Sequence, residues 1–265
     1  MAHLRGLDQL ISLKGRRALV TGAAAGIGRA IANRLAEAGA ALELVDIDGD
    51  CLAAARSELA ALGVAVGLHV ADLSDKDDRD RLWQNIDGHG PDILVNNAGI
   101  YPFKSFLEVD EAFYQRVMEI NLNSVYWMCQ HMIRKRSDKG GVIINIGSIE
   151  AVTPFKDDMA HYSVSKAGVI ALTRALAKEY GKQGFRVNAL VPGGILTRGI
   201  KTAALGILRS DFSLLKAGIE LKQRLPIGRL GRPDEVACMV LVLASDLSSY
   251  VHGAAIPVDG GFLSA

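Results

Sequence analysis

Cysteine is scarce in this 265-residue chain, which has only Cys51, Cys129 and Cys238. The three lie far apart and form no CxxC pair, no zinc-binding pattern and no even disulfide set. The sequence therefore predicts no metal site. We interpret the three residues as reduced thiols in the core of a cytoplasmic protein.

Excess charge and long apolar runs are also lacking. Thirty Lys and Arg against 29 Asp and Glu give a net charge of +1, so no broad basic surface for nucleic acid is expected. No apolar run approaches the ~18 residues of a membrane-spanning helix. Arg5, Asp8 and Lys14 interrupt the first fourteen residues, which lack the continuous apolar core and cleavage site of a signal peptide, so we expect none there. We expect residues 1–14 to be an N-terminal extension leading into the first strand.

What the chain does contain is a regular alternation of short apolar runs and helical patterns. Hydrophobic residues make up 49% and charged residues 22%, a globular composition. No linker, repeat or change of composition divides the chain. We therefore predict one α/β domain over 1–265, a doubly wound parallel sheet with helices on both faces. The expected strands are 17–21, 41–46, 64–70, 92–95, 142–146, 185–191 and 254–258, and the expected helices are 29–39, 49–62, 75–88, 108–137, 161–181 and 232–244.

A glycine-rich turn follows the first strand. Gly22, Gly26 and Gly28 have the spacing Gly-x-x-x-Gly-x-Gly, which differs from the usual GxGxxG fingerprint. Without Cβ atoms, the backbone can approach a pyrophosphate held at a helix N-terminus. The alternative is a plain glycine-rich connection, but the flanking strand and helix favour a dinucleotide site.

Two acidic residues follow the next strands. Asp46 lies about twenty positions beyond the glycine turn, where a carboxylate would bind an adenosine ribose. No Arg or Lys lies at 23–25 or 46–50 to meet a 2′-phosphate, so NAD is favoured over NADP. Asp72 is placed to accept the adenine amino group. The alternatives are that Asp46 caps the helix near 49–62 and that Asp72 caps the helix over 75–88.

Asparagine occurs at two places that need explaining. Asn96-Asn97-Ala98-Gly99 reads as a tight turn whose amides brace the sheet next to a cofactor. Asn121 and Asn123 lie inside the expected helix 108–137, although Asn is a poor helix former. A water or ligand contact, or a kink, would account for them.

A tyrosine and a lysine four residues apart share one face of the helix expected from 161. Tyr162 has an ordinary pKa of about 10, which a fixed cation at Lys166 would lower. Ser148 lies at the end of the strand 142–146, where ligands of parallel sheets bind. Solvated Tyr–Lys pairs are common, so the upstream motifs are what favour a proton-transfer site here.

The segment 198–224 is weakly patterned and carries six Lys or Arg against two acidic residues. Such segments in compact domains are often lids, and we assign 193–224 as a variable substrate lid. Its positive charge suits either an anionic substrate or a solvated face.

The ordered set of motifs resembles the classical short-chain dehydrogenase/reductase family over nearly the whole chain, from about residue 12. The matching residues are Thr21-Gly22-Ala23-Ala24-Ala25-Gly26-Ile27-Gly28, Asp72, Asn96-Asn97-Ala98-Gly99, Asn121, Ser148, Tyr162-x-x-x-Lys166, Pro192-Gly193 with Thr197, and Val258-Asp259-Gly260-Gly261.

The resemblance implies a seven-stranded Rossmann sheet, a nicotinamide cofactor and a homotetramer assembled through 108–137, 161–181 and the C-terminal strand region. It implies that Tyr162 is the general acid/base, that Lys166 lowers its pKa and holds the nicotinamide ribose, and that Ser148 polarises the substrate oxygen. Asn121 would support a water leading protons to Lys166, and Thr197 would contact the carboxamide. The implied cofactor-binding residues are Gly22, Ala25, Gly26, Ile27, Gly28, Asp46, Ile47, Asp72, Leu73, Asn97, Ala98, Gly99, Tyr162, Lys166, Pro192, Gly193, Ile195 and Thr197.

The expected activity is hydride transfer between NAD(H) and a secondary alcohol or carbonyl compound. Glu150, two residues past Ser148, makes a sugar or polyol a candidate substrate if its carboxylate does not simply face water. The alternative is a 3-oxoacyl-thioester reductase whose Arg134, Lys135 and Arg136 meet an acidic carrier, unless these residues only complement the helix dipole. A non-catalytic sensor has no need of a tuned acid/base, whereas a lyase or epimerase would show no net turnover of the dinucleotide.

Overall fold

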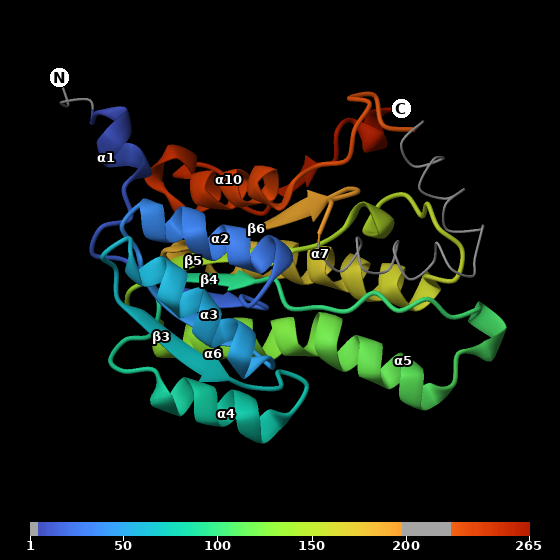
Figure 1. Cartoon of the computed structure of the whole chain (residues 1–265), viewed down its shortest axis with the longest axis horizontal. Helices are drawn as coiled ribbons and strands as arrows, with labels where there is room; N and C mark the ends of the chain where they lie inside the picture. Colours follow the sequence, from blue (N-terminus) through green and yellow to red (C-terminus); the bar gives the residue numbers. More distant parts are fainter. Residues whose placement is uncertain (1–4, 198–223) are drawn as a thin grey trace.

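The computed structural model describes residues 5–197 and 224–265. The predicted sheet is confirmed: seven parallel strands form one sheet in the order β3-β2-β1-β4-β5-β6-β7 (Figure 1). The order reverses between β1 and β4, and in such sheets ligands bind beyond the strand carboxyl ends at the reversal. The strands are β1 (Arg17–Thr21), β2 (Ala41–Asp46), β3 (Val66–Val70), β4 (Ile93–Asn96), β5 (Gly141–Ile146), β6 (Phe185–Pro192) and β7 (Ala255–Val258).

Helices cover both faces of the sheet (Figure 1). α2, α3 and α10 pack on one face and α4, α6 and α7 on the other, each over its own cluster of buried apolar side chains. The continuous apolar runs of the central strands fit this burial on both faces. The α-helices are α1 (Leu7–Ile11), α2 (Gly26–Glu37), α3 (Gly49–Ala60), α4 (Lys76–Asn85), α5 (Glu111–Met118), α6 (Ser124–Lys135), α7 (Ala160–Tyr180) and α10 (Pro233–Ala244).

Short 3-10 turns complete the described chain: η1 (Phe106–Glu108), η3 (Ile149–Ala151), η4 (Gly181–Gln183), η5 (Asp246–Ser248) and η6 (Phe262–Ser264). In the ranges that the structure describes, no helix is long and apolar enough to cross a membrane. Most of the predicted lid, residues 198–223, lies outside the described part of the chain.

Three expectations about local structure were wrong or incomplete. The N-terminal extension forms the short helix α1, and Leu13 beyond it is fully buried. The single helix expected over 108–137 is interrupted by a π-helical turn, η2 (Glu119–Asn123), between α5 and α6. Cys129 is buried as expected, but Cys51 and Cys238 are exposed on α3 and α10, so they are not core thiols.

The π-helical turn explains why asparagine is tolerated inside the helix. The Ser124 N–H bonds the Glu119 carbonyl across the wide turn, and the Ser124 hydroxyl donates to the Ile120 carbonyl at 2.6 Å. Asn121 is fully buried at this turn. A π-helical turn, and not a regular α-helix, therefore surrounds Asn121, and such turns occur frequently at functional sites.

Candidate active site

The predicted site residues come together at the carboxyl end of the sheet. The glycine turn follows β1, Asn97 follows β4, Ser148 follows β5, and Pro192 ends β6. Helix α7 packs on one face of the sheet and carries Tyr162 and Lys166 in its first turns. Parallel strands thus bring motifs more than a hundred residues apart to one edge.

Glycine is required at the three positions of the turn for different structural reasons. A Cβ on Gly28 would lie 2.0 Å from the Gly22 carbonyl oxygen, and one on Gly22 would lie 2.8 Å from Asn97 Nδ2. These two glycines therefore allow the turn to pack on itself and on β4. Gly26 has φ +58, and a Cβ there would meet only Thr197 at 3.6 Å. Gly26 therefore faces Thr197 across the turn, so two residues predicted to bind the cofactor lie opposite each other.

The turn fits a dinucleotide phosphate. The residue before α2, Ala25, makes no side-chain cap, so none of the helix N–H groups is satisfied by a capping side chain there. Backbone N–H groups at a helix N-terminus beside glycine are the donors that a pyrophosphate needs. The residues present therefore fit a nicotinamide dinucleotide.

Asn97 braces the sheet at this point, as expected. Its Nδ2 donates to the carbonyls of Thr21 and Gly22 at 3.0 and 3.1 Å. The Thr21 hydroxyl in turn accepts the N–H groups of Asn97 and Ala98 at 2.9 and 3.0 Å. These reciprocal bonds lock the end of β1 to the end of β4 beneath the glycine turn.

Asp46 and Asp72 do not cap the helices that follow them. Asp46 Oδ2 accepts the Ala24 N–H at 2.9 Å, which ties β2 to the glycine turn, while Asp48 caps α3. Asp72 Oδ1 accepts from the Ser74 N–H and hydroxyl at 2.9 and 2.6 Å, while Asp75 caps α4. The capping alternatives for both carboxylates are therefore wrong.

The other predicted cofactor residues line the same edge. Ile47 is exposed just past β2, whereas Leu73 is buried. Gly193 packs so tightly that a Cβ would lie 2.8 Å from Asp259 Cα, and Ile195 pairs with Gly231 in a parallel bridge. The tight packing of Gly193 fixes the chain that leads to Thr197.

The Tyr162 phenol is half-buried, and burial raises its pKa to about 12. A hydrogen bond with the Ser148 side chain opposes the rise, whereas the charges of Glu150 and Tyr101 add to it. In the protein alone the phenol is therefore neutral at neutral pH. Lys166 is not among the groups that shift this pKa, so the lowering expected from it is not seen in the protein alone.

Lys166 lies close to Tyr162 but is held separately. Its Nζ donates to the Ile146 carbonyl at 2.9 Å and lies 5.9 Å from the centroid of the Tyr162 ring. Burial lowers the Lys166 pKa to about 8. The Lys166 side chain can therefore exchange between ammonium and amine near physiological pH, which suits a proton-transfer site.

Asn121 and Lys166 both lie close to Gly99. A Cβ added to Gly99 would be 3.1 Å from Asn121 Oδ1 and 3.5 Å from Lys166 Nζ. The Asn121 amide accepts the Ile100 N–H and donates to the Ile100 carbonyl, both at 2.8 Å, and also donates to the Ser165 hydroxyl at 3.3 Å. The side chain is thus occupied in holding the chain after β4 against α7.

Glu150 does not face water. It is 8% exposed, its Oε2 accepts the Phe155 N–H at 3.1 Å, and burial raises its pKa. It is also hydrogen-bonded to the Lys156 N–H. The carboxylate therefore holds the loop between η3 and α7 while remaining close enough to Tyr162 to affect its pKa.

Sequence reasoning missed the polar network beneath the site. Asn96 Nδ2 donates to Asn145 Oδ1 at 2.8 Å, and Asn145 Nδ2 donates to the Thr173 hydroxyl at 2.9 Å, all within the core. Asparagine at the end of two apolar strands was the available signal. These bonds join β4, β5 and α7, and so fix the helix that carries Tyr162.

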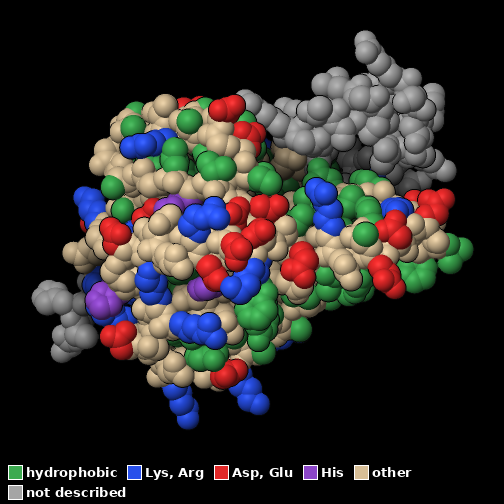
Figure 2. Space-filling view, turned by 90° about the horizontal axis from the view of Figure 1, so that it is seen from below, with side chains coloured by type: hydrophobic (Ala, Val, Ile, Leu, Met, Phe, Trp, Pro, Cys, Tyr) green, Lys and Arg blue, Asp and Glu red, His purple; other side chains and the backbone are tan. Residues whose placement is uncertain are grey.

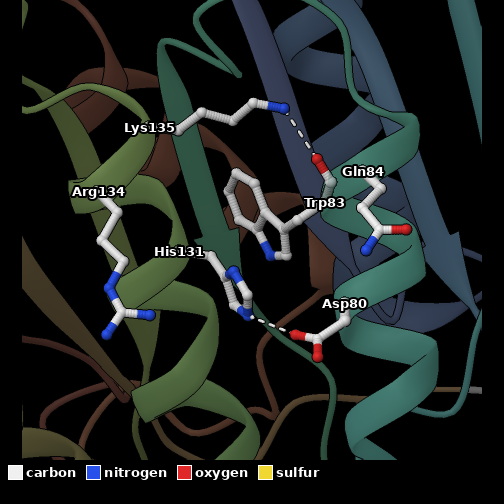
Figure 3. A pocket seen from close by; sticks show the side chains of 6 residues that line it. All are labelled: Asp80, Trp83, Gln84, His131, Arg134 and Lys135. Atoms are coloured by element: carbon white, nitrogen blue, oxygen red, sulfur yellow. Dashed lines mark hydrogen bonds and ion pairs between the residues drawn. The ribbon is translucent and has the colours of Figure 1, made fainter.

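The basic run at the end of α6 is largely occupied by structural bonds. Lys135 donates to the carbonyls of Trp83 and Ile86 at the end of α4, and Arg136 bonds the Gly140 carbonyl and pairs with Asp92. Figure 3 shows Lys135 turned toward α4 and Arg134 on the other side of the hollow between α4 and α6.

This hollow is also lined by Asp80, Gln84 and a His131 ring stacked on Trp83. It is lined by α4 and α6 side chains and shares no residue with the Tyr162 site. In the described ranges, no group of three or more His, Cys, Asp or Glu side chains could hold a metal ion.

Known proteins share this arrangement over almost the whole chain. Residues 22–263 match the family model described as Enoyl-(Acyl carrier protein) reductase. An L-rhamnose 1-dehydrogenase (NAD(P)(+)) of Azotobacter vinelandii is 38% identical over 255 residues, which cover 92% of this chain and 94% of that protein. A 3-oxoacyl-(acyl-carrier-protein) reductase of Aquifex aeolicus is 36% identical over 258 residues, covering 95% and 98%.

Among solved structures, the L-sorbose reductase of Gluconobacter frateurii, complexed with NADPH and L-sorbose, has a TM-score of 0.90 at 30% identity. The match covers 97% of this chain and 99% of that one. Sheet and site thus define a nicotinamide-dependent oxidoreductase that acts on alcohol or carbonyl groups. Within that class, the chain belongs to the short-chain dehydrogenase/reductase family.

Proposed function

We propose that the protein transfers a hydride between NAD(H) and a secondary alcohol of a sugar or polyol. The observation that carries this proposal is the convergence of Tyr162, Ser148 and Lys166 at the end of β5 and the start of α7. The L-rhamnose and L-sorbose enzymes among the relatives support a polyhydroxylated substrate.

Tyr162 acts as the general acid/base in this proposal. The carbinol proton passes to Tyr162 in oxidation and returns from it in reduction, so one residue serves both directions. Ser148 donates a hydrogen bond to the substrate oxygen. Because burial alone keeps the phenol neutral, a cation near Tyr162 must favour its ionised form for oxidation. Lys166 supplies one such charge when protonated.

Asn121 is proposed as a positioning residue. By bonding Ile100 and Ser165, it keeps the segment after β4 against α7, next to Lys166 Nζ. The proton route from Lys166 to solvent then runs past this buried amide, through water held at the π-helical turn.

The glycine turn, Asn97–Gly99 and the Pro192–Thr197 segment are proposed to hold the dinucleotide, whose nicotinamide supplies the hydride acceptor or donor. NAD preference rests on Asp46. Its carboxylate accepts the N–H groups of Ala24 and Asp48, which leaves lone pairs for a ribose diol, and it would repel a 2′-phosphate. Asp72 and Thr197 keep their proposed roles toward the adenine and the carboxamide.

Glu150 is proposed to contact substrate hydroxyls. A carboxylate offers about four lone-pair sites, and its two backbone donors leave capacity for a hydroxyl. Its position just after Ser148 places this capacity beside the reacting oxygen.

A 3-oxoacyl-thioester reductase is the second candidate, and the relative from Aquifex aeolicus supports it. The basic run at the end of α6 does not: Lys135 and Arg136 are bonded to backbone carbonyls, which leaves Arg134 to meet an acidic carrier.

We also propose a cytoplasmic homotetramer. Tyr126 and Trp127 on α6 and Val164 on α7 are exposed, and apolar faces of this kind suit subunit contacts. Figure 2 also shows hydrophobic side chains at the right-hand end of the view, where α5 lies in Figure 1. The three free thiols fit a reducing compartment. Sedimentation equilibrium would give the subunit count.

The decisive test is NAD reduction over a panel of sugars, polyols, simple secondary alcohols and hydroxyacyl thioesters, repeated with Tyr162→Phe. We expect sugars or polyols to be oxidised fastest. Tyr162→Phe should lower turnover by roughly 10²- to 10⁴-fold while leaving the dissociation constant of NADH nearly unchanged. Wild-type turnover in this variant would refute the acid/base role, and faster turnover of thioesters would favour the second candidate.

A further inference from the structure

The wall of the site next to Tyr162 is built from two segments that lie side by side. The Lys104 N–H bonds the Asp158 carbonyl at 3.1 Å, and His161 Nε2 bonds the Pro102 carbonyl at 2.8 Å. The chain after β4 is thereby attached to the loop that leads into α7. Asp158 has φ +63, a strained value for a residue with a side chain, so the packing around it holds this loop in one conformation.

A lysine of this loop lies over an exposed aromatic ring at the wall. Lys156 Nζ is 4.3 Å from the centroid of Phe103, whose side chain is 45% exposed. Phe103 packs edge-on against Tyr101, with ring centroids 6.5 Å apart, and Tyr101 is close enough to influence Tyr162. The ammonium therefore lies one aromatic pair away from the proposed acid/base.

The Lys156 charge is incompletely compensated. Its side chain is half-buried, and burial lowers its pKa. Among the described residues, Glu150 is the only charged group that favours the cation, and it does so without forming an ion pair. The Glu150 carboxylate is itself bonded to the backbone of Phe155 and Lys156. A partly desolvated ammonium beside a catalytic centre would gain from a second anion.

We propose that Lys156 binds the carboxylate of the substrate, and hence that the preferred substrates are polyhydroxy acids rather than neutral polyols. This inference rests on the proposed function and specifies the substrate class of that same site. Glu150 then has a positioning role as well, since its bonds to the loop backbone set where Lys156 stands.

Lys104 provides a matched control. Its Nζ also lies over a ring, 4.8 Å from the centroid of Phe113, but it is paired with Asp110 at 2.7 Å. The two lysines thus share the aromatic contact and differ in whether a carboxylate of the protein already neutralises them.

The test compares six-carbon aldonates with the matching hexitols. Both the kcat/KM for NAD reduction and the binding to the complex with NADH, by calorimetry, would be measured. For the wild type, the best aldonate should be favoured over its hexitol by about tenfold or more, the worth of one charge-assisted bond. Lys156→Met should remove this preference by raising the KM for aldonates, with a much smaller change in the hexitol values, whereas Lys104→Met should change neither the preference nor the hexitol values.

Aldonate binding that is no tighter than hexitol binding would overturn the proposal, as would an equal loss for both classes in Lys156→Met. Because binding is measured apart from turnover, the two failures can be told apart. If aldonates bind through Lys156 but no panel compound is oxidised, the proposed reaction is wrong and the anion site stands.

Discussion

The two halves of the carboxyl edge are built differently. Around the glycine turn, polar groups are bonded to backbone: Asn97 to the carbonyls of Thr21 and Gly22, and Asp46 to the Ala24 N–H. Around Tyr162 the wall instead carries exposed rings and cations, including Phe103 beneath Lys156. One half is fixed by the protein's own hydrogen bonds, and the other has binding capacity to spare.

Residues of the family motifs lie in both halves, but Phe103 and Lys156 of the wall near Tyr162 are not among them. The polar groups around the glycine turn are already hydrogen-bonded within the protein, so the turn selects its ligand by shape. The residues that create this shape form a motif that is recognisable in the sequence. A wall of rings and half-compensated charges depends on which residues the loops place there. We therefore expect substitutions around the glycine turn, the cofactor half, to abolish dinucleotide binding. Substitutions in the wall around Tyr162, the substrate half, should instead change substrate preference by degrees.

The largest effect is expected at Gly28. In Gly28→Ala, the new Cβ would lie only 2.0 Å from the Gly22 carbonyl oxygen. Because this oxygen belongs to the backbone, the clash can be relieved only by moving the glycine turn. NADH binding, followed by fluorescence, should be lost, and turnover with it. Gly49→Ala is the matched control: this glycine begins α3, and its Cβ would meet only the Val70 side chain at 3.2 Å. If Gly28→Ala binds NADH normally, the cofactor half is not as rigid as described.

The next effect concerns Lys166, where stability and activity should change in opposite directions. Its folded pKa of about 8 lies below the ordinary value of 10.5, so the buried charge costs stability below pH 8. That cost fades as the pH rises from about 8 to 10.5. Lys166→Met should therefore raise the melting temperature at pH 7, and this increase over the wild type should become smaller toward pH 10.5. The same variant should lose most of its turnover.

Lys135→Met serves as the counterpart. This lysine also donates to backbone carbonyls, at the end of α4, but far from the site. Its loss should lower the melting temperature by a few degrees at pH 7 and leave turnover unchanged. A fall in melting temperature at pH 7 for both variants would show that Lys166 is a structural residue and not one held at a stability cost.

The smallest effect is expected at Asp46. Asp46→Ala removes both the repulsion of a 2′-phosphate and the bond to the Ala24 N–H, so the ratio of kcat/KM for NAD to that for NADP should fall by about tenfold. Asp46→Asn keeps an acceptor for Ala24 and isolates the charge. An unchanged ratio in both variants would remove Asp46 from the ribose site.

The fold and the positions of the main motifs were predictable from the sequence. Strands that are buried on both faces are apolar runs in the sequence, and a helical pattern follows each run. This alternation predicts a parallel sheet and shows which residues lie at its carboxyl edge. Convergence of Ser148 and Tyr162 follows in turn from parallel topology.

Properties set by tertiary surroundings were not predictable. The capping alternative named Asp46 and Asp72, whereas Asp48 and Asp75 cap α3 and α4, because several acidic residues cluster before each helix. In the protein alone, burial raises the Tyr162 pKa by more than the hydrogen bond with Ser148 lowers it, and the spacing of Tyr162 and Lys166 says nothing of burial. The bond of Lys135 to the Trp83 carbonyl was not predictable either, because Trp83 lies 52 residues away in the sequence.

The π-helical turn has a consequence for the phase of the long helix. A turn closed five residues back is wider than an α-turn, so everything after Asn123 is rotated relative to an unbroken helix. Val117, Asn121, Val125 and Cys129 are all buried at four-residue intervals, a spacing that a regular 3.6-residue helix would carry progressively off one face. The single wide turn thus resets the register, so that an amide in the active site and the apolar side chains under the sheet both point inward from one continuous helical segment.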